Sequence, residues 1–194
     1  MRSAGLILAA GSSTRMGSPK QLLPVEGRPL LELVVSRACA SSLDEVLVVL
    51  GAGADAIMDR VDLGRAGVVR NPNHAAGMST SLRAGLAALG RDVERAMVIL
   101  GDQPEISPRQ LDELLDLQAM SRLPAAALSF GGLLHPPVVL ARELWRDLER
   151  LEGDVGCRAL IRARPELVAP LEAAPDPGHP VDVDTPEDYR RLTS

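Results

Sequence analysis

Aromatic side chains are scarce in this chain of 194 residues. Phe, Trp and Tyr together make up 2% of it, with one residue of each type. A core therefore has to be built from Leu, Val, Ile and Ala, which the hydrophobic content of 46% supplies. Because single-stranded nucleic acids bind by stacking bases on aromatic rings, the composition argues against that class of partner.

Clustered basic residues are also missing. The 21 Lys and Arg residues are scattered, and the formal net charge at pH 7 is -5. A surface that binds a nucleic-acid duplex needs grouped cations to neutralise the phosphates. We therefore expect no nucleic-acid partner, and we expect any anion site to be local, formed by one loop and a few cations.

The chain has only two cysteines and no long apolar run. Cys39 and Cys157 have neither the spacing of a zinc site nor that of a disulfide framework, and each is interpreted as a small packing residue. The apolar run from Gly5 to Ala10 is too short for a signal peptide or a membrane span. We therefore expect no membrane partner and a cytoplasmic location.

Short apolar runs alternate with longer segments of helical spacing. The runs are Leu6–Ala9, Val46–Leu50, the weaker Val68–Val69, and Met97–Leu100. Apolar runs without alternation are typical of strands buried on both faces. The order predicts an α/β fold with a single doubly wound, mostly parallel sheet and helices on both faces. Since no repeat or linker divides the chain, residues 1–194 are predicted to form one domain.

Two helix starts are marked by a hydroxyl residue followed by proline. Ser107-Pro108-Arg109-Gln110 has an N-cap residue, a first-turn proline and a partner for a capping box. Thr185-Pro186-Glu187-Asp188 is predicted to begin another helix.

The segment after the first apolar run lies where open α/β sheets bind ligands, at the carboxyl ends of the strands. It reads Leu8-Ala9-Ala10-Gly11-Ser12-Ser13-Thr14-Arg15-Met16-Gly17-Ser18-Pro19-Lys20. Gly11 and Gly17 allow the backbone to approach an anion, and Arg15 and Lys20 add two cations. The segment is not a Walker A motif, because Gly17 is followed by serine rather than lysine. An ordinary surface turn is the alternative.

A second polar loop leads into a helix. Residues 71–85 read Asn-Pro-Asn-His-Ala-Ala-Gly-Met-Ser-Thr-Ser-Leu-Arg-Ala-Gly. The loop delivers Gly77-Met78-Ser79 to a helix N-terminus, where N–H groups and hydroxyls can bind a ribose or a phosphate. A plain helix cap is the alternative.

Acidic residues in two further segments could hold a metal ion. Asp102 follows the most apolar run, where a carboxylate is costly unless it is paired or binds a metal. Mg²⁺ takes one or two carboxylates together with substrate phosphates. Asp182 and Asp184 alternate just before the predicted helix, so a strand there would put both on one face. The alternatives are a turn residue for Asp102 and a helix N-terminal acid for Asp184.

One segment matches a dinucleotide-binding fingerprint. Gly51-Ala52-Gly53-Ala54-Asp55-Ala56 follows a strand, but no acid lies about 20 residues further on to hold a ribose. We therefore interpret Gly51 and Gly53 as a tight strand-to-helix turn.

The first loop, Leu8–Lys20, carries a family resemblance. Together with Gln21-Leu22-Leu23-Pro24 and Gly27-Arg28-Pro29-Leu30 it resembles the opening signature of the nucleotidyltransferases, most closely the molybdenum cofactor cytidylyltransferase-like branch. The resemblance implies a Rossmann-like fold, in which the loop wraps a triphosphate that Arg15 and Lys20 neutralise. The nucleotide-binding residues that it implies are Leu8, Ala9, Ala10, Gly11, Ser12, Arg15, Lys20, Asn71, Gly77, Ser81 and Asp102.

The same resemblance implies Mg²⁺ as the cofactor. Asp102 matches the metal ligand of the family. A second carboxylate comes from the motif that includes Asp182 and Asp184, and Asp184 is preferred.

The resemblance is weaker for the acceptor side. Residues 153–158 are close to the family segment Gly-Asp-x-Gly-x-Arg. Leu133-Leu134, in contrast, replace the Gly-Arg-x-Gly that usually precedes the His-Pro pair. We expect His135 and Asp154 to bind the acceptor, with a structural, hydrogen-bonded histidine as the alternative for His135.

The expected reaction moves a nucleoside monophosphate onto a phosphorylated small molecule, a molybdopterin-type cofactor, and releases pyrophosphate. Leu8-Ala9-Ala10-Gly11 resembles branches that use CTP. An acceptor phosphate is already anionic, so Arg15, Lys20 and Asp102 would act by alignment and charge neutralisation. Transfer to another phosphorylated metabolite, such as a sugar phosphate, and a non-catalytic nucleotide-binding module are the alternatives.

Overall fold

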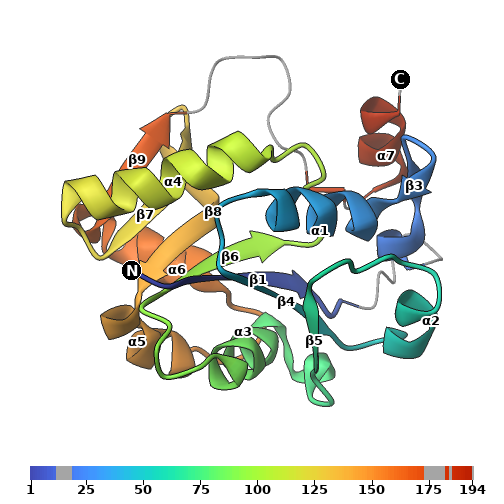
Figure 1. Ribbon diagram of the computed structural model, residues 1–194, viewed down its shortest axis with the longest axis horizontal. Coiled ribbons are helices and arrows are strands. Elements are labelled where there is room, and N and C mark those ends of the chain that lie inside the picture. The colour runs from blue at the N-terminus through green and yellow to red at the C-terminus, as the bar shows by residue number, and fades with distance from the viewer. Residues whose placement is uncertain (12–18, 173–181, 184, 194) are drawn as a thin grey trace.

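The computed structural model describes residues 1–11, 19–172, 182–183 and 185–193 (Figure 1). Its centre is a seven-stranded sheet with the order β5-β4-β1-β6-β8-β7-β9. Every strand runs parallel to its neighbours except β8, which is antiparallel to both β6 and β7. The strands of the sheet are β1 (Ser3–Ala9), β4 (Glu45–Leu50), β5 (Gly67–Arg70), β6 (Arg95–Leu100), β7 (Ala125–Phe130), β8 (Leu133–Ala141) and β9 (Val168–Glu172).

Helices and a small hairpin connect the strands. The hairpin pairs β2 (Pro24–Val25) with β3 (Arg28–Pro29). The α-helices are α1 (Leu30–Ala40), α2 (Ala54–Met58), α3 (Met78–Ala88), α4 (Pro108–Ser121), α5 (Trp145–Glu149), α6 (Cys157–Ala163) and α7 (Pro186–Leu192). The 3-10 helices are η1 (Lys20–Leu22), η2 (His74–Ala76), η3 (Arg142–Leu144) and η4 (Pro165–Leu167). No described helix is long and apolar enough to cross a membrane.

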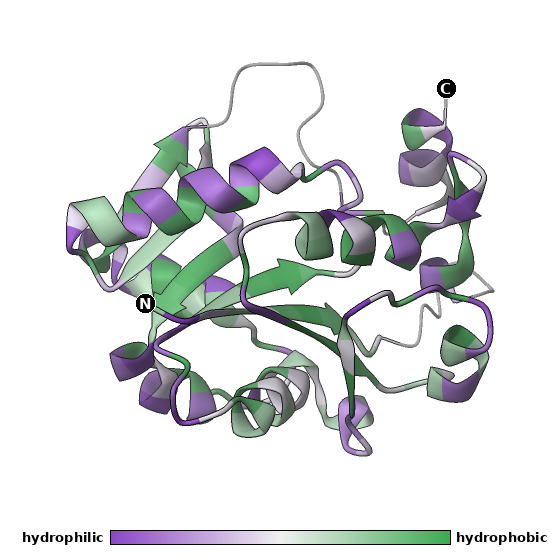
Figure 2. Cartoon of the chain, viewed as in Figure 1, coloured by the Kyte–Doolittle hydropathy of each residue, from purple (hydrophilic) through white to green (hydrophobic). Residues whose placement is uncertain are grey.

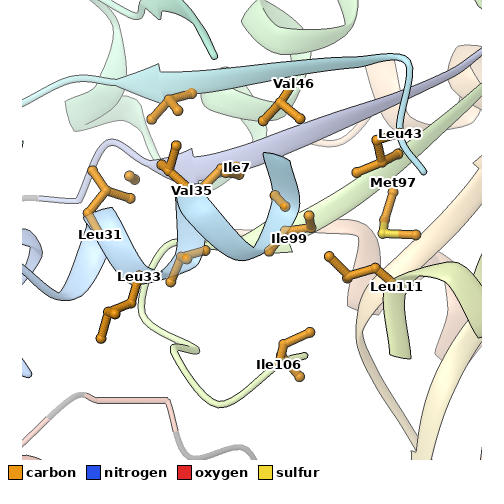
Figure 3. Close-up of a cluster of buried hydrophobic side chains, with 14 of the residues drawn as sticks. Ile7, Leu31, Leu33, Val35, Leu43, Val46, Met97, Ile99, Ile106 and Leu111 are labelled. Carbon is orange, nitrogen blue, oxygen red and sulfur yellow. The ribbon is translucent and has the colours of Figure 1, made fainter. Parts of the chain in front are cut away.

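The sheet has a hydrophobic core on each face, because successive strand residues point to opposite sides. Ile7 of β1 packs with α1 and α4 on one face, and Leu6 packs with α3, α5 and α6 on the other. Figure 3 shows Ile7 and Ile99 beside Leu31 and Val35 of α1. Figure 2 shows hydrophobic strands between helices of mixed character. This arrangement confirms the predicted α/β fold with helices on both faces.

All four apolar runs form strands, and both capping boxes are present. Ser107 Oγ accepts a hydrogen bond from the Gln110 N–H at 3.2 Å, and Thr185 Oγ1 accepts one from the Asp188 N–H at 3.2 Å. Val68–Val69 belongs to the edge strand β5, which explains its weak signal, since Val68 is 38% exposed.

Strand order places the ligand position between β1 and β6. The chain passes from β1 to β4 and β5 on one side, and then returns to form β6 on the other side of β1. At such a switch point the connections leave the strand ends in opposite directions and open a crevice. The carboxyl ends of β1 and β6 therefore frame the expected site.

Candidate active site

A cavity of about 980 Å³ opens at this switch point. Leu8, Ala9, Ala10 and Gly11 line it from the end of β1. The other predicted residues that line it are Lys20, Gly77, Ser81, Asp102 and Asp154. The topology thus brings together residues from four separate segments of the chain.

Lys20 and Asp102 form an ion pair in this cavity, although 82 positions separate them. Lys20 Nζ donates a hydrogen bond to Asp102 Oδ2, and the two side chains are 18% and 14% exposed. A carboxylate at the end of a buried strand is costly unless an opposite charge pairs with it. Asp102 is therefore held by a cation from the first loop.

Gly101 allows the ends of β1 and β6 to approach each other. Its N–H donates to the Leu8 carbonyl at 3.0 Å. A Cβ at this position would lie 2.8 Å from the Cβ of Ala9. Glycine therefore lets Asp102 enter the cavity beside β1.

Gln21 is a buried positioning residue that the sequence reasoning did not identify. Its side chain is 2% exposed, and Nε2 donates to the carbonyls of Ala9 at 3.0 Å and Gly11 at 3.1 Å. These bonds fix the backbone on both sides of Ala10. The sequence signal that could have identified Gln21 is its polar side chain between Lys20 and the apolar Leu22-Leu23 pair.

The N-terminus of α3 is bound by the loop before α6. The Ser79 N–H donates to the Gly153 carbonyl at 3.2 Å, and the Met78 N–H lies 3.3 Å from Asp154 Oδ1. Asp154, expected to bind the acceptor, thus contacts the helix that was expected to bind the nucleotide. The two predicted half-sites share one wall of the cavity.

Asn71 lies behind the cavity and organises its wall. It is 4% exposed, and Nδ2 donates to Thr80 Oγ1 at 2.8 Å and Ser81 Oγ at 2.9 Å. Ser81 lines the cavity, whereas Asn71 is not among the described residues that line it. From its position behind the cavity, Asn71 therefore orients Ser81, which lines it.

His135 lies on β8 and is also outside the described lining of the cavity. Its ring faces Phe130 edge-on, with centroids 5.8 Å apart. The adjacent Pro136 lines the cavity instead. Three other predicted positions, Ser12, Arg15 and Asp184, lie outside the described residues.

Asp182 lines the cavity and is held from two sides. Gln103 Nε2 donates to Asp182 Oδ1 at 2.7 Å, and Arg158 Nη2 lies 3.6 Å from Oδ2. The next residue, Val183, is fully buried, and its N–H donates to the Asp102 carbonyl at 3.2 Å. This segment therefore lies directly beside Asp102.

Four further residues that line the cavity are His74, Cys157, Arg158 and Arg162. Cys157 and Arg158 belong to the family-like segment 153–158, whereas His74 and Arg162 were given no role from sequence. Burial raises the pKa of the Cys157 thiol to about 12. A thiol with that pKa stays protonated near neutral pH, so it does not supply a thiolate nucleophile.

The dinucleotide-like segment forms the predicted turn. Gly53 has φ of 67° and is the N-cap residue of α2. A Cβ on Gly51 would lie 2.5 Å from the Cβ of His74. Gly51 thus makes room for a residue that lines the cavity.

Asp102 is the described residue whose chemistry best fits a divalent cation. Its oxygen donors suit Mg²⁺, which needs few protein ligands when substrate phosphates supply the rest. Within the described ranges, no group of three or more His, Cys, Asp or Glu side chains could hold a metal ion.

Comparisons with known proteins show the family of this chain. Residues 5–168 match the family model of the MobA-like NTP transferase domain. Nicotine blue oxidoreductase of Paenarthrobacter nicotinovorans is 35% identical, with 97% of this chain and 95% of that protein covered. The 2-C-methyl-D-erythritol 4-phosphate cytidylyltransferase of Azoarcus sp. is 37% identical, with 71% of this chain and 58% of that protein covered.

A solved structure extends the similarity to the whole fold. Rv0371c of Mycobacterium tuberculosis, in complex with manganese, superposes with a TM-score of 0.85 at 30% identity. The alignment covers 100% of this chain and 98% of that chain. This chain therefore belongs to the MobA-like NTP transferase family of nucleotidyltransferases.

Proposed function

We propose that this protein transfers CMP from CTP to a phosphorylated small molecule of the molybdopterin type, with Mg²⁺, and releases pyrophosphate. The observation that carries the proposal is the cavity between β1 and β6, in which Gly11, Lys20 and Asp102 face one space. That position at a topological switch point suits a nucleotide. Family membership supports the transfer chemistry, and Lys20, Asp102 and Ala10 support its details.

Lys20 and Arg15 neutralise the triphosphate. A lysine acts on phosphates as a compact point charge, and the glycine-flanked backbone at Gly11 lets N–H groups approach them. When the triphosphate enters, Lys20 exchanges the Asp102 carboxylate for phosphate oxygens. The ion pair therefore keeps both charges compensated until the nucleotide binds.

Asp102 and Asp184 would hold the metal ion. Mg²⁺ in this position supplies positive charge beside the phosphates. The manganese complex of Rv0371c supports a divalent cation in a related protein. Once Lys20 turns to the triphosphate, the Asp102 carboxylate would be available to the cation.

The acceptor phosphate is the nucleophile. One of its oxygens attacks the α-phosphorus of CTP in line, a new phosphorus–oxygen bond forms, and the bond to the leaving pyrophosphate breaks. Because a phosphate is already anionic near neutral pH, no side chain has to remove a proton. The protein contributes alignment and charge neutralisation.

Ala10 supports a cytosine base. It is 6% exposed, lines the cavity, and is fixed on both sides by the bonds from Gln21. Its methyl group restricts the space at the end of β1, which favours a pyrimidine over a larger purine. The similarity to a cytidylyltransferase points the same way.

The test is a pyrophosphate-release screen of CTP, GTP, ATP and UTP with molybdopterin, sugar phosphates and no acceptor, each with and without MgCl₂. We expect release that needs CTP, molybdopterin and Mg²⁺ together. Pyrophosphate release with a sugar phosphate, but not with molybdopterin, would show that the acceptor is a sugar phosphate. An absence of both release and nucleotide binding across the screen would overturn the proposal.

Hydride transfer is a second candidate, because one relative bears the name of an oxidoreductase. The turn at Gly51 gives it little support, since the space beside that glycine is filled by His74. NADH and NADPH with a quinonoid dye as acceptor form a separate arm of the same screen. Nucleotide oxidation in that arm, without pyrophosphate release, would favour this candidate.

A further inference from the structure

Two arginines of α6 face the same cavity as Lys20 and Asp102. Arg158 and Arg162 are one helical turn apart and both line the cavity. Cys157 and Ile161, their neighbours on the helix, are 3% and 1% exposed and pack into the core. The buried residues thus fix the rotation of α6 so that both arginines lie on the side that lines the cavity.

The two arginines differ in their ion pairs within the described part of the chain. Arg158 Nη2 lies 3.6 Å from Asp182 Oδ2, with the two side chains 34% and 32% exposed. Arg162 forms no ion pair with any residue of the described part of the chain. Arg158 therefore shares its charge with Asp182, whereas the other acid on this side of the cavity, Asp154, lies at the N-terminus of α3.

Asp182 cannot follow Arg158 if the arginine turns away. Gln103 is 2% exposed, and its Nε2 holds Asp182 Oδ1 at 2.7 Å. The backbone of Val183 is bound to the Asp102 carbonyl at 3.2 Å. Asp182 is thus a fixed anion, and Arg158 is the partner with freedom to rotate toward a ligand.

We propose that Arg158 and Arg162 bind the phosphate of the acceptor, and that Asp182 holds Arg158 in place until that phosphate arrives. This inference rests on the proposed function and adds a second anion subsite to it. A planar guanidinium group binds phosphate oxygens in pairs, which suits two arginines converging on one anion. When the acceptor phosphate arrives, Arg158 leaves the Asp182 carboxylate and pairs with the dianionic phosphate.

The position of this subsite suits the reaction. Through Val183 the wall adjoins Asp102, so a phosphate held there lies next to the phosphates of the nucleotide. Two anions at close range repel each other, and the guanidinium groups offset that repulsion. The cavity of about 980 Å³ is at the upper end of the range for ligand sites, roughly 300–1,000 Å³.

The test measures phosphate binding without turnover. The nucleotide half is filled with α,β-methylene CTP and MgCl₂, and inorganic phosphate is then titrated in by calorimetry. We expect millimolar binding to the wild-type protein and at least about a tenfold loss in Arg158→Gln and in Arg162→Gln. Asp182→Asn should bind phosphate several-fold more tightly, because Arg158 is released from its ion pair.

Two further variants serve as controls. Arg109→Gln, on the outer surface of α4 with its side chain 88% exposed, should bind phosphate like the wild-type protein. Arg158→Lys keeps the charge and loses the planar fork, so it should lose part of the affinity. Melting temperatures verify that each variant is folded.

The outcomes separate this inference from the proposed function. If the nucleotide analogue binds but phosphate does not, or if Arg158→Gln and Arg162→Gln bind phosphate as the wild type does, the subsite is wrong and the proposed function stands. An equal loss in Arg109→Gln would also overturn the subsite. If the wild-type protein binds no nucleotide analogue, both fail.

Discussion

Gly77 lies directly against the backbone of Gly153. A Cβ built on Gly77 would be 2.2 Å from the carbonyl carbon of Gly153 and 2.5 Å from the Asp154 nitrogen. Gly77 also has φ of 105°, a conformation that other residues rarely adopt. The first turn of α3 and the loop before α6 are thus joined with no room for a side chain between them.

Gly77→Ala should therefore lower the free energy of unfolding by at least about 2 kcal/mol, because strain and a backbone clash add. Urea unfolding followed by circular dichroism measures it. Gly27→Ala is the matched control, since Gly27 has φ of 78° with nothing within 4 Å of a Cβ. We expect a smaller loss there, on the order of 1 kcal/mol. Equal losses of stability in the two variants would show that the backbone at Gly153 shifts easily to make room for the added Cβ.

Asp102→Asn should reduce Mg²⁺-dependent transfer on the order of 10²-fold or more while the protein stays folded. The amide keeps the shape of the side chain and loses the charge that pairs with Lys20 and would hold the metal. Pyrophosphate release at saturating CTP is the measurement. Near-normal turnover in a purified, folded variant would remove Asp102 from the metal site.

Ala10→Gly should relax the preference for CTP over GTP. Removing one methyl group from the end of β1 gives a purine more space, and such a change is worth about 1–3 kcal/mol of discrimination at most. The ratio of kcat/KM for CTP and GTP in both proteins measures the effect. A wild-type protein that already prefers GTP would contradict the base assignment and leave the transfer chemistry untouched.

Asp44→Asn should make stability less dependent on pH in the acid range. The Ser3 N–H donates to Asp44 Oδ2 at 2.7 Å, and this backbone hydrogen bond lowers the pKa of Asp44 despite some desolvation. A depressed pKa adds stability above the unfolded value of about 3.9, and that gain is lost as pH falls through the folded value.

The measurement for Asp44 is urea unfolding between pH 7 and pH 2.5. The wild-type protein should lose stability more steeply below about pH 4 than the variant does. Asp59→Asn, at the exposed C-terminal end of α2, is the control and should follow the wild-type curve. Parallel curves for Asp44→Asn and the wild type would contradict the prediction.

The first half of the fold could be predicted because its strands are buried on both faces. Val46–Leu50 and Met97–Leu100 are continuous apolar runs for that reason. In the second half, β7 begins with three alanines, which favour strands weakly. β8 contains Pro136 and Pro137, residues that usually argue against a strand. They lie where the register shifts between Ala127 and Leu128, at an interruption of the ladder that accommodates them.

The site could be predicted where one short segment carries several signals. Gly11 and Lys20 belong to such a segment, and both line the cavity. Arg158 and Asp182 carry no local signal of their meeting, because only the packing of α6 and the return of residues 182–183 bring them together. The hydrogen-bond partners of Asn71 could not be predicted either, because they lie on the following helix, α3.

The bond from the Val183 N–H to the Asp102 carbonyl makes the cavity, but not the sheet, depend on residues 182–183. All seven strands of the sheet end by Glu172, so residues 182–183 add no strand to it. Val183 is fully buried, and Asp182 lies beside Arg158. Proteolytic removal of this segment would therefore leave every strand in place and open one wall of the cavity.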